Sequence, residues 1–247
     1  MSCATFYFYP DLNTFLPPFR RHTPLSNTFD GRVSIKDMIE SIGVPHTEIE
    51  TIIVNDSSED FSYIVQDGDL IHVYPPFTAI DVSPLKPLRP PRPEEPRFVL
   101  DTHLGQLATY LRMLGFDTLY RNDFPDDELA QISSTENRIL LTRDRGLLKR
   151  GIVIYGHYMR TTNPQRQVIE VLRHYTLVPV VNPGERCVRC NGMISPVDKE
   201  TVGDRLHAKT LKYYDEFYTC DSCDRIYWKG SHYEQMQQFI ERVIREA

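Results

Sequence analysis

Two short apolar runs, each with an aspartate at or just beyond its end, constrain the fold of this chain more than any other feature. Residues 98–100 lead into Asp101, and residues 139–142 lead through Arg143 into Asp144. Short apolar runs that alternate with helical patterns are typical of strands in a parallel sheet. Since the carboxyl ends of parallel strands meet at one edge, where α/β proteins bind their ligands, we expect these two acids to lie close together.

The middle of the chain alternates strand and helix patterns. Strands are predicted at residues 98–100, 117–120, 139–141, 152–155 and 177–181. Helical patterns lie between them, and the first is an apolar stripe of Leu104, Leu107, Ala108, Leu111 and Leu114 that ends at Gly115. Arg112, on the opposite side of that helix from the leucines, is predicted to lie at the surface. Regular alternation predicts an α/β domain, residues 97–183, with a mostly parallel sheet and helices on both faces.

Residues 1–79 predict a different, β-rich domain. Residues 4–9, 52–54 and 70–74 have the composition of strands. Ser34 precedes a helix with apolar residues at helical spacing, and Gly43 ends it. The order strand, strand, helix, strand, strand is that of a β-grasp, or ubiquitin-like, domain. Residues 80–96 then hold six prolines (84, 87, 90, 91, 93 and 96), so they are predicted to form a semi-rigid linker without helix or strand.

The cysteines predict a zinc site in the last part of the chain, residues 184–247. Four of the five form two Cys-x-x-Cys pairs, which are Cys187, Cys190, Cys220 and Cys223. Two such pairs complete a tetrahedral four-thiolate site, so a structural zinc ribbon is predicted, followed by a C-terminal helix. The aromatics Tyr218, Tyr227 and Trp228 lie near several basic residues, and they either stack nucleic acid bases or pack around the metal.

Acidic residues of the α/β domain predict a second metal site. Asp126 and Asp127 begin a helix between the two aspartate-ended strands. Each of these acids could simply cap a helix or complement its dipole. Acids from separate segments at one sheet edge would repel one another unless a divalent cation lay between them. Arg143 and Arg145 could clamp a phosphate there, or be solvated cations that pair with Asp126 or Asp127.

The distribution of charge is compatible with a nucleic acid partner, although the net charge is −6. Residues 1–80 carry four Lys or Arg against 11 Asp or Glu, whereas residues 81–184 carry 14 against 12. Residues 137–173 hold eight basic residues and two acidic ones, which suits phosphates that approach a metal but also suits a solvated helix face.

Residues 97–150 resemble the PIN-like ribonuclease family named for the C-terminal domain of the Mut-seven exonuclease. The matching runs are Phe98-Val-Leu-Asp101, Leu104 to Asp117, Asp126-Asp-Glu-Leu129 and Ile139-Leu-Leu-Thr-Arg-Asp144. The likeness continues through the cysteine segment to His232, and a ubiquitin-like module often precedes this domain in the family. The resemblance implies that Asp101, Asp126 and Asp144 bind Mg²⁺ or Mn²⁺ and cut RNA, with Asp127 as a second candidate and Asp123 as a candidate fourth acid.

The sequence therefore predicts a metal-dependent ribonuclease, and the alternative is a catalytically silent RNA-binding or adaptor protein. The β-grasp domain resembles small sulfur carriers, but Pro75-Pro76-Phe77 stands where those carriers end in a free Gly-Gly terminus. A docking or regulatory role, with a protein as partner, is the better prediction for it. The first residues lack a secretory pattern, and no apolar run approaches the ~18 residues that span a bilayer, so we expect a cytoplasmic protein without membrane contact.

Overall fold

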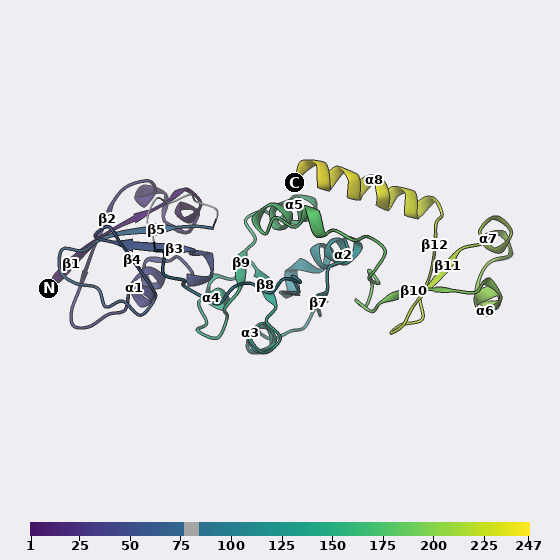
Figure 1. Ribbon diagram of the computed structural model, residues 1–247, viewed down its shortest axis with the longest axis horizontal. Coiled ribbons are helices and arrows are strands. Elements are labelled where there is room, and N and C mark those ends of the chain that lie inside the picture. The colour runs from purple at the N-terminus through teal and green to yellow at the C-terminus, as the bar shows by residue number, and fades with distance from the viewer. Residues whose placement is uncertain (77–83) are drawn as a thin grey trace. The chain divides into compact units, whose positions relative to one another are not determined.

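In the computed structural model, residues 1–76 and 84–247 are described, and they fall into two compact units. One consists of Met1–Glu94 and Asp126–Tyr158, and the other of Glu95–Pro125 and Met159–Ala247. The beginning of the predicted linker, residues 80–83, lies outside the described residues, and residues 84–97 carry neither helix nor strand. The chain has the mixed α/β fold that its sequence predicts, with a ubiquitin-like N-terminal domain (Figure 1).

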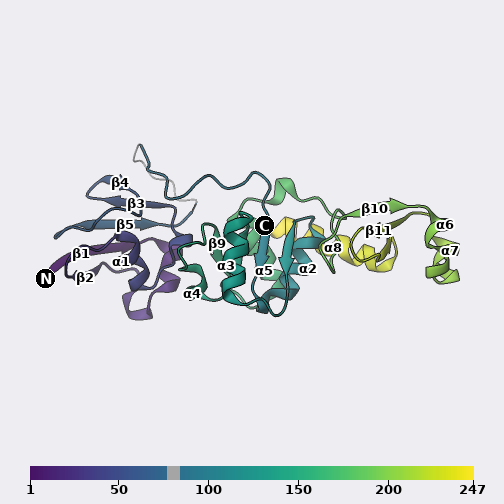
Figure 2. The ribbon, with the colours of Figure 1, turned by 90° about the horizontal axis from the view of Figure 1, so that it is seen from below.

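The ubiquitin-like domain is built on a five-stranded sheet with the order β2-β1-β5-β3-β4. Its strands are β1 (Ser2–Phe8), β2 (Leu25–Phe29), β3 (Thr51–Val54), β4 (Ser57–Glu59) and β5 (Leu70–Tyr74). The central pair β1 and β5 is parallel, and every other pair is antiparallel. Helix α1 (Ile35–Ile42) covers one face of this sheet (Figure 2).

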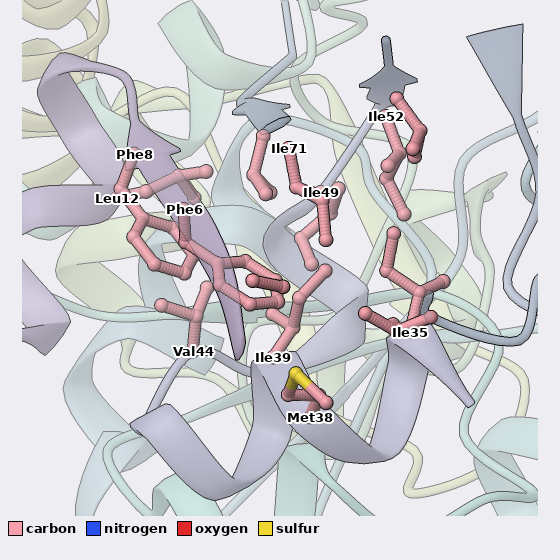
Figure 3. Close-up of a cluster of buried hydrophobic side chains, with 14 of the residues drawn as sticks. Phe6, Phe8, Leu12, Ile35, Met38, Ile39, Val44, Ile49, Ile52 and Ile71 are labelled. Atoms are coloured by element: carbon pink, nitrogen blue, oxygen red, sulfur yellow. The ribbon is translucent and has the colours of Figure 1, made fainter. Parts of the chain in front are cut away.

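Side chains of α1 and the sheet form one apolar core. In β1 the buried residues alternate with partly buried ones, so Phe6 and Phe8 project toward the helix. Figure 3 shows Ile35 and Ile39 of α1 in the same cluster as these rings. Full burial of a side chain of this size stabilises a fold by about 1.5–3 kcal/mol, so the cluster is the main source of stability here. The predicted caps are present: Ser34 Oγ accepts from the Asp37 amide, 3.1 Å away.

The same unit contains a second set of elements from the middle of the chain. They are α3 (Asp126–Thr135), β8 (Ile139–Thr142), α4 (Arg145–Leu148) and β9 (Gly156–Tyr158). β8 is buried along its whole length and pairs in parallel with β9. The predicted strand at residues 152–155 is wrong, because the segment that pairs with β8 starts at Gly156. Val153 and Tyr155 are buried but precede the strand, and their burial gave the segment its strand-like pattern.

The other unit begins with β6 (Phe98–Leu100), α2 (Gly105–Met113) and β7 (Thr118–Tyr120), and it continues with α5 (Pro164–His174). β6 and β7 pair in parallel, and α2 packs against α5. Gly115 ends the helical segment as predicted, with a φ of +97° that favours glycine. The predicted strand at residues 177–181 is wrong: Val178–Val180 is a 3-10 helix. Pro179 lacks the N–H that a strand needs to pair.

The C-terminal part of this unit is a small antiparallel sheet with the order β10-β11-β12. Its elements are β10 (Ile194–Val197), α6 (Lys199–Val202), α7 (Ala208–Tyr213), β11 (Phe217–Cys220), β12 (Ile226–Trp228) and α8 (Ser231–Glu246). As predicted, α8 packs on the rest of the unit, since Ile240 and Val243 are buried and Phe239 stacks on Tyr110 with ring centroids 4.3 Å apart. Among the described residues, no helix combines the length and the apolar character needed to cross a membrane.

Candidate functional site

Asp101 lies where β6 ends. Its carboxylate accepts a hydrogen bond from the Thr102 amide at 2.6 Å, and the residue is the N-cap of a short 3-10 helix, Thr102–Leu104. The side chain is 8% exposed. The Tyr120 hydroxyl of the neighbouring strand donates to the Thr102 carbonyl at 2.8 Å, which holds this turn in place. Asp101 therefore performs the capping role, and its acid group is fixed at the carboxyl end of a strand.

Asp144 lies two residues after the end of β8. Its Oδ1 accepts from the amides of Gly146, at 2.6 Å, and Leu147, at 3.4 Å, and so caps α4. The Asp144 amide donates to Thr142 Oγ1 at 2.9 Å, which fixes the turn from strand to helix. Among the described residues, no hydrogen bond reaches the second oxygen, Oδ2. The capping role uses one oxygen of this exposed carboxylate and leaves the other available for a ligand.

Asp126 and Asp127 are the first two residues of α3, where carboxylates complement the helix dipole. The Arg150 guanidinium forms an ion pair with Asp127. The hydrogen bond to Asp127 raises the pKa of Arg150, and the nearby charges of Asp126 and Asp144 add to this effect. Asp126, Asp127 and Asp144 therefore all act on the Arg150 guanidinium, so the electrostatic potential at this position is negative. Nothing local in the sequence links Arg150 to α3, so this ion pair could not be predicted from the chain.

Arg145, predicted to contact phosphate, is engaged by the ubiquitin-like domain. Its guanidinium donates to the Phe15 carbonyl at 2.8 Å and lies over the rings of Phe15 and Tyr158, 5.2 and 5.5 Å from their centroids. Lys149 Nζ similarly donates to the Glu40 carbonyl. The basic residues that follow Asp144 thus hold α4 against the N-terminal domain, a role that charge counting does not reveal.

Buried polar contacts join the same two parts of the chain. Glu48 is 1% exposed, its Oε1 accepts from the Tyr158 amide at 2.6 Å, and it lies 3.1 Å from Nδ1 of the fully buried His157. His46 Nε2 lies 2.8 Å from the Val153 carbonyl. Buried polar groups are costly unless they are paired, so these contacts require β9 and the N-terminal domain to stay together. The elements that carry Asp126, Asp127 and Asp144 are therefore fixed by the ubiquitin-like domain.

The four cysteines of the two pairs come together, as predicted. Their sulfur atoms all lie within 4.8 Å of one another, with Cys187 and Cys223 at 3.7 Å and Cys190 and Cys220 at 3.4 Å. A tetrahedron with Zn–S bonds of about 2.3 Å has edges of about 3.8 Å, so the set has the size and the donors that zinc requires. Two knuckles, one before β10 and one that begins at the last residue of β11, supply the pairs.

Groups around the sulfurs also suit a metal. Burial opposes ionisation of the Cys187 thiol, but the Tyr227 hydroxyl, 3.0 Å from its sulfur, and backbone amides outweigh this and lower its pKa to about 6. Tyr227 therefore supports the metal centre, as one of the two sequence interpretations expects. Burial raises the pKa of the Cys190 thiol to about 12 and also raises that of Cys220, so the full set of thiolates needs the positive charge that a bound zinc ion would supply.

Polar contacts fix the first cysteine knuckle to the α/β elements. Arg112, predicted at the surface, is 5% exposed, and it donates to the carbonyls of Thr118 and Arg189, each at 2.9 Å. Asn191 accepts from the Thr118 amide and donates to Asp117, each at 2.8 Å. The predicted surface position of Arg112 is therefore wrong, because the knuckle covers the side chain, which the pattern of one helix cannot show.

These features define a modular α/β protein with an N-terminal ubiquitin-like domain and a C-terminal module whose four cysteines can hold a metal ion. Comparison with protein families finds two matches: the model described as Mut7-C RNAse domain over residues 96–240, and Mut7-C ubiquitin over residues 1–81. The chain belongs to the Mut7-C RNAse domain family, which confirms the resemblance seen in its sequence and indicates a nuclease-like function. No curated protein and no solved structure matches it.

Proposed function

We propose that this protein is a metal-dependent ribonuclease that hydrolyses phosphodiester bonds of RNA. The match of residues 96–240 to a family described as an RNAse domain carries the proposal. Asp101, Asp126 and Asp144 are the proposed ligands of Mg²⁺ or Mn²⁺, and Asp127 is the second candidate from α3. Two of the sequence motifs place an aspartate one or two residues after a parallel strand, the end at which α/β proteins bind ligands.

The donor set suits a hard divalent cation. Mg²⁺ and Mn²⁺ prefer carboxylate oxygens, and Asp144 has one oxygen that helix capping does not use. Asp126, Asp127 and Asp144 all raise the pKa of Arg150, so a positive charge is favoured where they lie. A bound cation would supply the same attraction with two charges, and it would activate water and stabilise the leaving oxygen.

The protein's own groups have distinct proposed roles. Asp101 and Asp144 are held by helix capping, so their carboxylates need little reorganisation to bind a cation. Arg143 and Arg145 are the proposed phosphate contacts. The Arg145 guanidinium already donates to the Phe15 and Thr14 carbonyls, so only its remaining N–H groups can contact a phosphate. Its replacement is therefore expected to lower stability as well as cleavage. Arg150 competes with a cation for Asp127, which favours Asp126 as the ligand from α3.

Cleavage of single-stranded RNA with added Mn²⁺ tests the proposal. Asp101→Asn and Asp144→Asn keep a side-chain oxygen for capping but lose the charge that binds metal. Each is expected to lower the rate by roughly 100-fold or more, because a catalytic cation contributes several kcal/mol and 1.4 kcal/mol is tenfold. Asp126→Asn is expected to have a larger effect than Asp127→Asn.

Asp204→Asn, which changes an exposed acid of the C-terminal module, is the matched control and should cleave at the wild-type rate. Unchanged cleavage in both Asp101→Asn and Asp144→Asn would reject the site. RNA binding without cleavage under any divalent cation would instead identify the protein as a silent RNA-binding or adaptor protein.

A further inference from the structure

A pocket of about 440 Å³ lies in the C-terminal unit, beside the metal-binding module. Its walls come from β12, the start of α8 and the segment before β10, and Met113 from the end of α2 contributes as well. Pockets that hold small organic ligands have about 300–1,000 Å³, so a planar base with part of its ribose fits this space. The pocket contains neither the proposed catalytic acids nor the four cysteines.

Aromatic rings form much of its lining. Tyr214, Tyr218, Trp228 and Tyr233 line the pocket with Tyr227, whose hydroxyl already contacts Cys187. Trp228 is 36% exposed, an unusual position for so large an apolar ring. The backbone of Gly230 supports the indole: a Cβ at Gly230 would lie 2.9 Å from Trp228 Nε1. One aromatic face is thus held in place with room beside it.

Apart from the tyrosines, the ionisable side chains that line the pocket are all basic. Arg186, Arg225, Lys229 and His232 line the pocket, and among its lining residues, all within the described chain, none is Asp or Glu. Lys229 pairs with Glu216 at 2.7 Å and Arg186 lies 3.9 Å from Asp117, but within the described residues no hydrogen bond or ion pair engages the Arg225 guanidinium. The 16-residue helix α8 also begins here, and its N-cap, Gly230, offers no side chain to the first amides. These features favour an anion at the mouth of the pocket.

We propose that this pocket binds a nucleobase of single-stranded RNA, stacked on Trp228, with the adjacent phosphate near Arg225 and the start of α8. Rings that stack bases beside cations that bind phosphates are how proteins hold single strands without reading their sequence. The choice of RNA as the ligand rests on the proposed function. The pocket then binds a substrate nucleotide away from the acids that are proposed to cleave the chain.

Trp228 is the chain's single tryptophan, so its fluorescence reports directly on the pocket. Zinc-loaded, full-length protein is titrated with short oligouridylate and oligoadenylate, with no Mg²⁺ or Mn²⁺ added, and anisotropy of labelled RNA gives the Kd. Both RNAs are expected to quench the emission, whereas an abasic oligomer with the same number of phosphates should not. Trp228→Ala is expected to raise the Kd by about 5- to 150-fold, and Trp228→Phe by much less, because a ring remains to stack.

Tyr213→Ala is the matched control, since Tyr213 is a 66% exposed aromatic of the same module that does not line the pocket. Gly230→Ala keeps the indole but displaces it, so it should weaken binding while the tryptophan signal stays measurable. Equal Kd values for Trp228→Ala and Tyr213→Ala, or quenching by a peptide but not by RNA, would overturn the proposal. Cleavage is assayed separately: RNA cleavage with an unchanged Kd in Trp228→Ala refutes the pocket alone, and base binding without cleavage refutes only the proposed nuclease.

Discussion

Replacing Cys220 by serine is expected to release zinc and unfold the C-terminal module. This module has little apolar core: in the described structure between residues 186 and 230, the buried hydrophobic side chains are Cys187, Val202, Phe217 and Cys220. Two of these four are themselves metal ligands, so the module depends on the metal for its stability. Structural zinc contributes apparent binding free energies of about 10–16 kcal/mol near neutral pH in small zinc modules, and most of this is folding free energy.

The measurement combines metal content with hydrogen exchange. Wild-type protein is expected to hold one zinc per chain, and Cys220→Ser to hold none and to lose exchange protection over residues 186–230. The control is Cys3→Ser, because Cys3 lies in β1, far along the chain from the four-cysteine set. Retention of zinc and protection by Cys220→Ser would show that the four sulfurs do not form a metal site. A chelator should reproduce the effect of Cys220→Ser in the wild-type protein.

Local signals in the sequence predicted much of the fold. The spacing of Cys187, Cys190, Cys220 and Cys223 predicted the sulfur cluster, and Ser34 and Gly43 delimited α1 correctly. These predictions succeeded because cap residues and Cys-x-x-Cys knuckles act over a few residues. The aspartates after residues 98–100 and 139–142 do follow parallel strands, as their apolar runs predicted.

The errors share a physical cause, which is that the decisive partner lies far away in the sequence. Arg112 is buried because the carbonyl of Arg189 accepts its hydrogen bond. β9 was misplaced because its middle residue, His157, is a polar residue that is buried beside Glu48, more than 100 positions earlier. No pattern within residues 150–160 contains that information. The contacts of the ubiquitin-like domain with Arg145 and Tyr158 are also distant in sequence, and its predicted docking or regulatory role, with a protein partner, stays a prediction.

Glu48→Ala is expected to destabilise the unit that contains the ubiquitin-like domain and β9. The substitution removes the acceptor of the Tyr158 amide and leaves His157 buried without this carboxylate. Leaving a buried donor such as this amide without its acceptor costs about 1–3 kcal/mol. Glu48→Gln, which keeps an oxygen for the amide, should cost less. Urea denaturation followed by circular dichroism measures the loss of stability, and hydrogen exchange over residues 126–158 locates it.

Glu50→Ala is the matched control, because it removes an acidic side chain from the same segment without removing the buried contact of Glu48. Glu50 is half exposed and lies 3.8 Å from Arg89, and surface pairs of this kind contribute at most about 1 kcal/mol. Equal hydrogen-exchange rates over residues 126–158 in Glu48→Ala and Glu50→Ala would show that the buried Glu48 contact does not stabilise these residues. Because α3 and α4 carry Asp126, Asp127 and Asp144, Glu48→Ala is also expected to lower RNA cleavage without touching any proposed ligand. The ubiquitin-like domain would then act on catalysis as a structural support for the acids, which a carrier or a tethered docking module would not do.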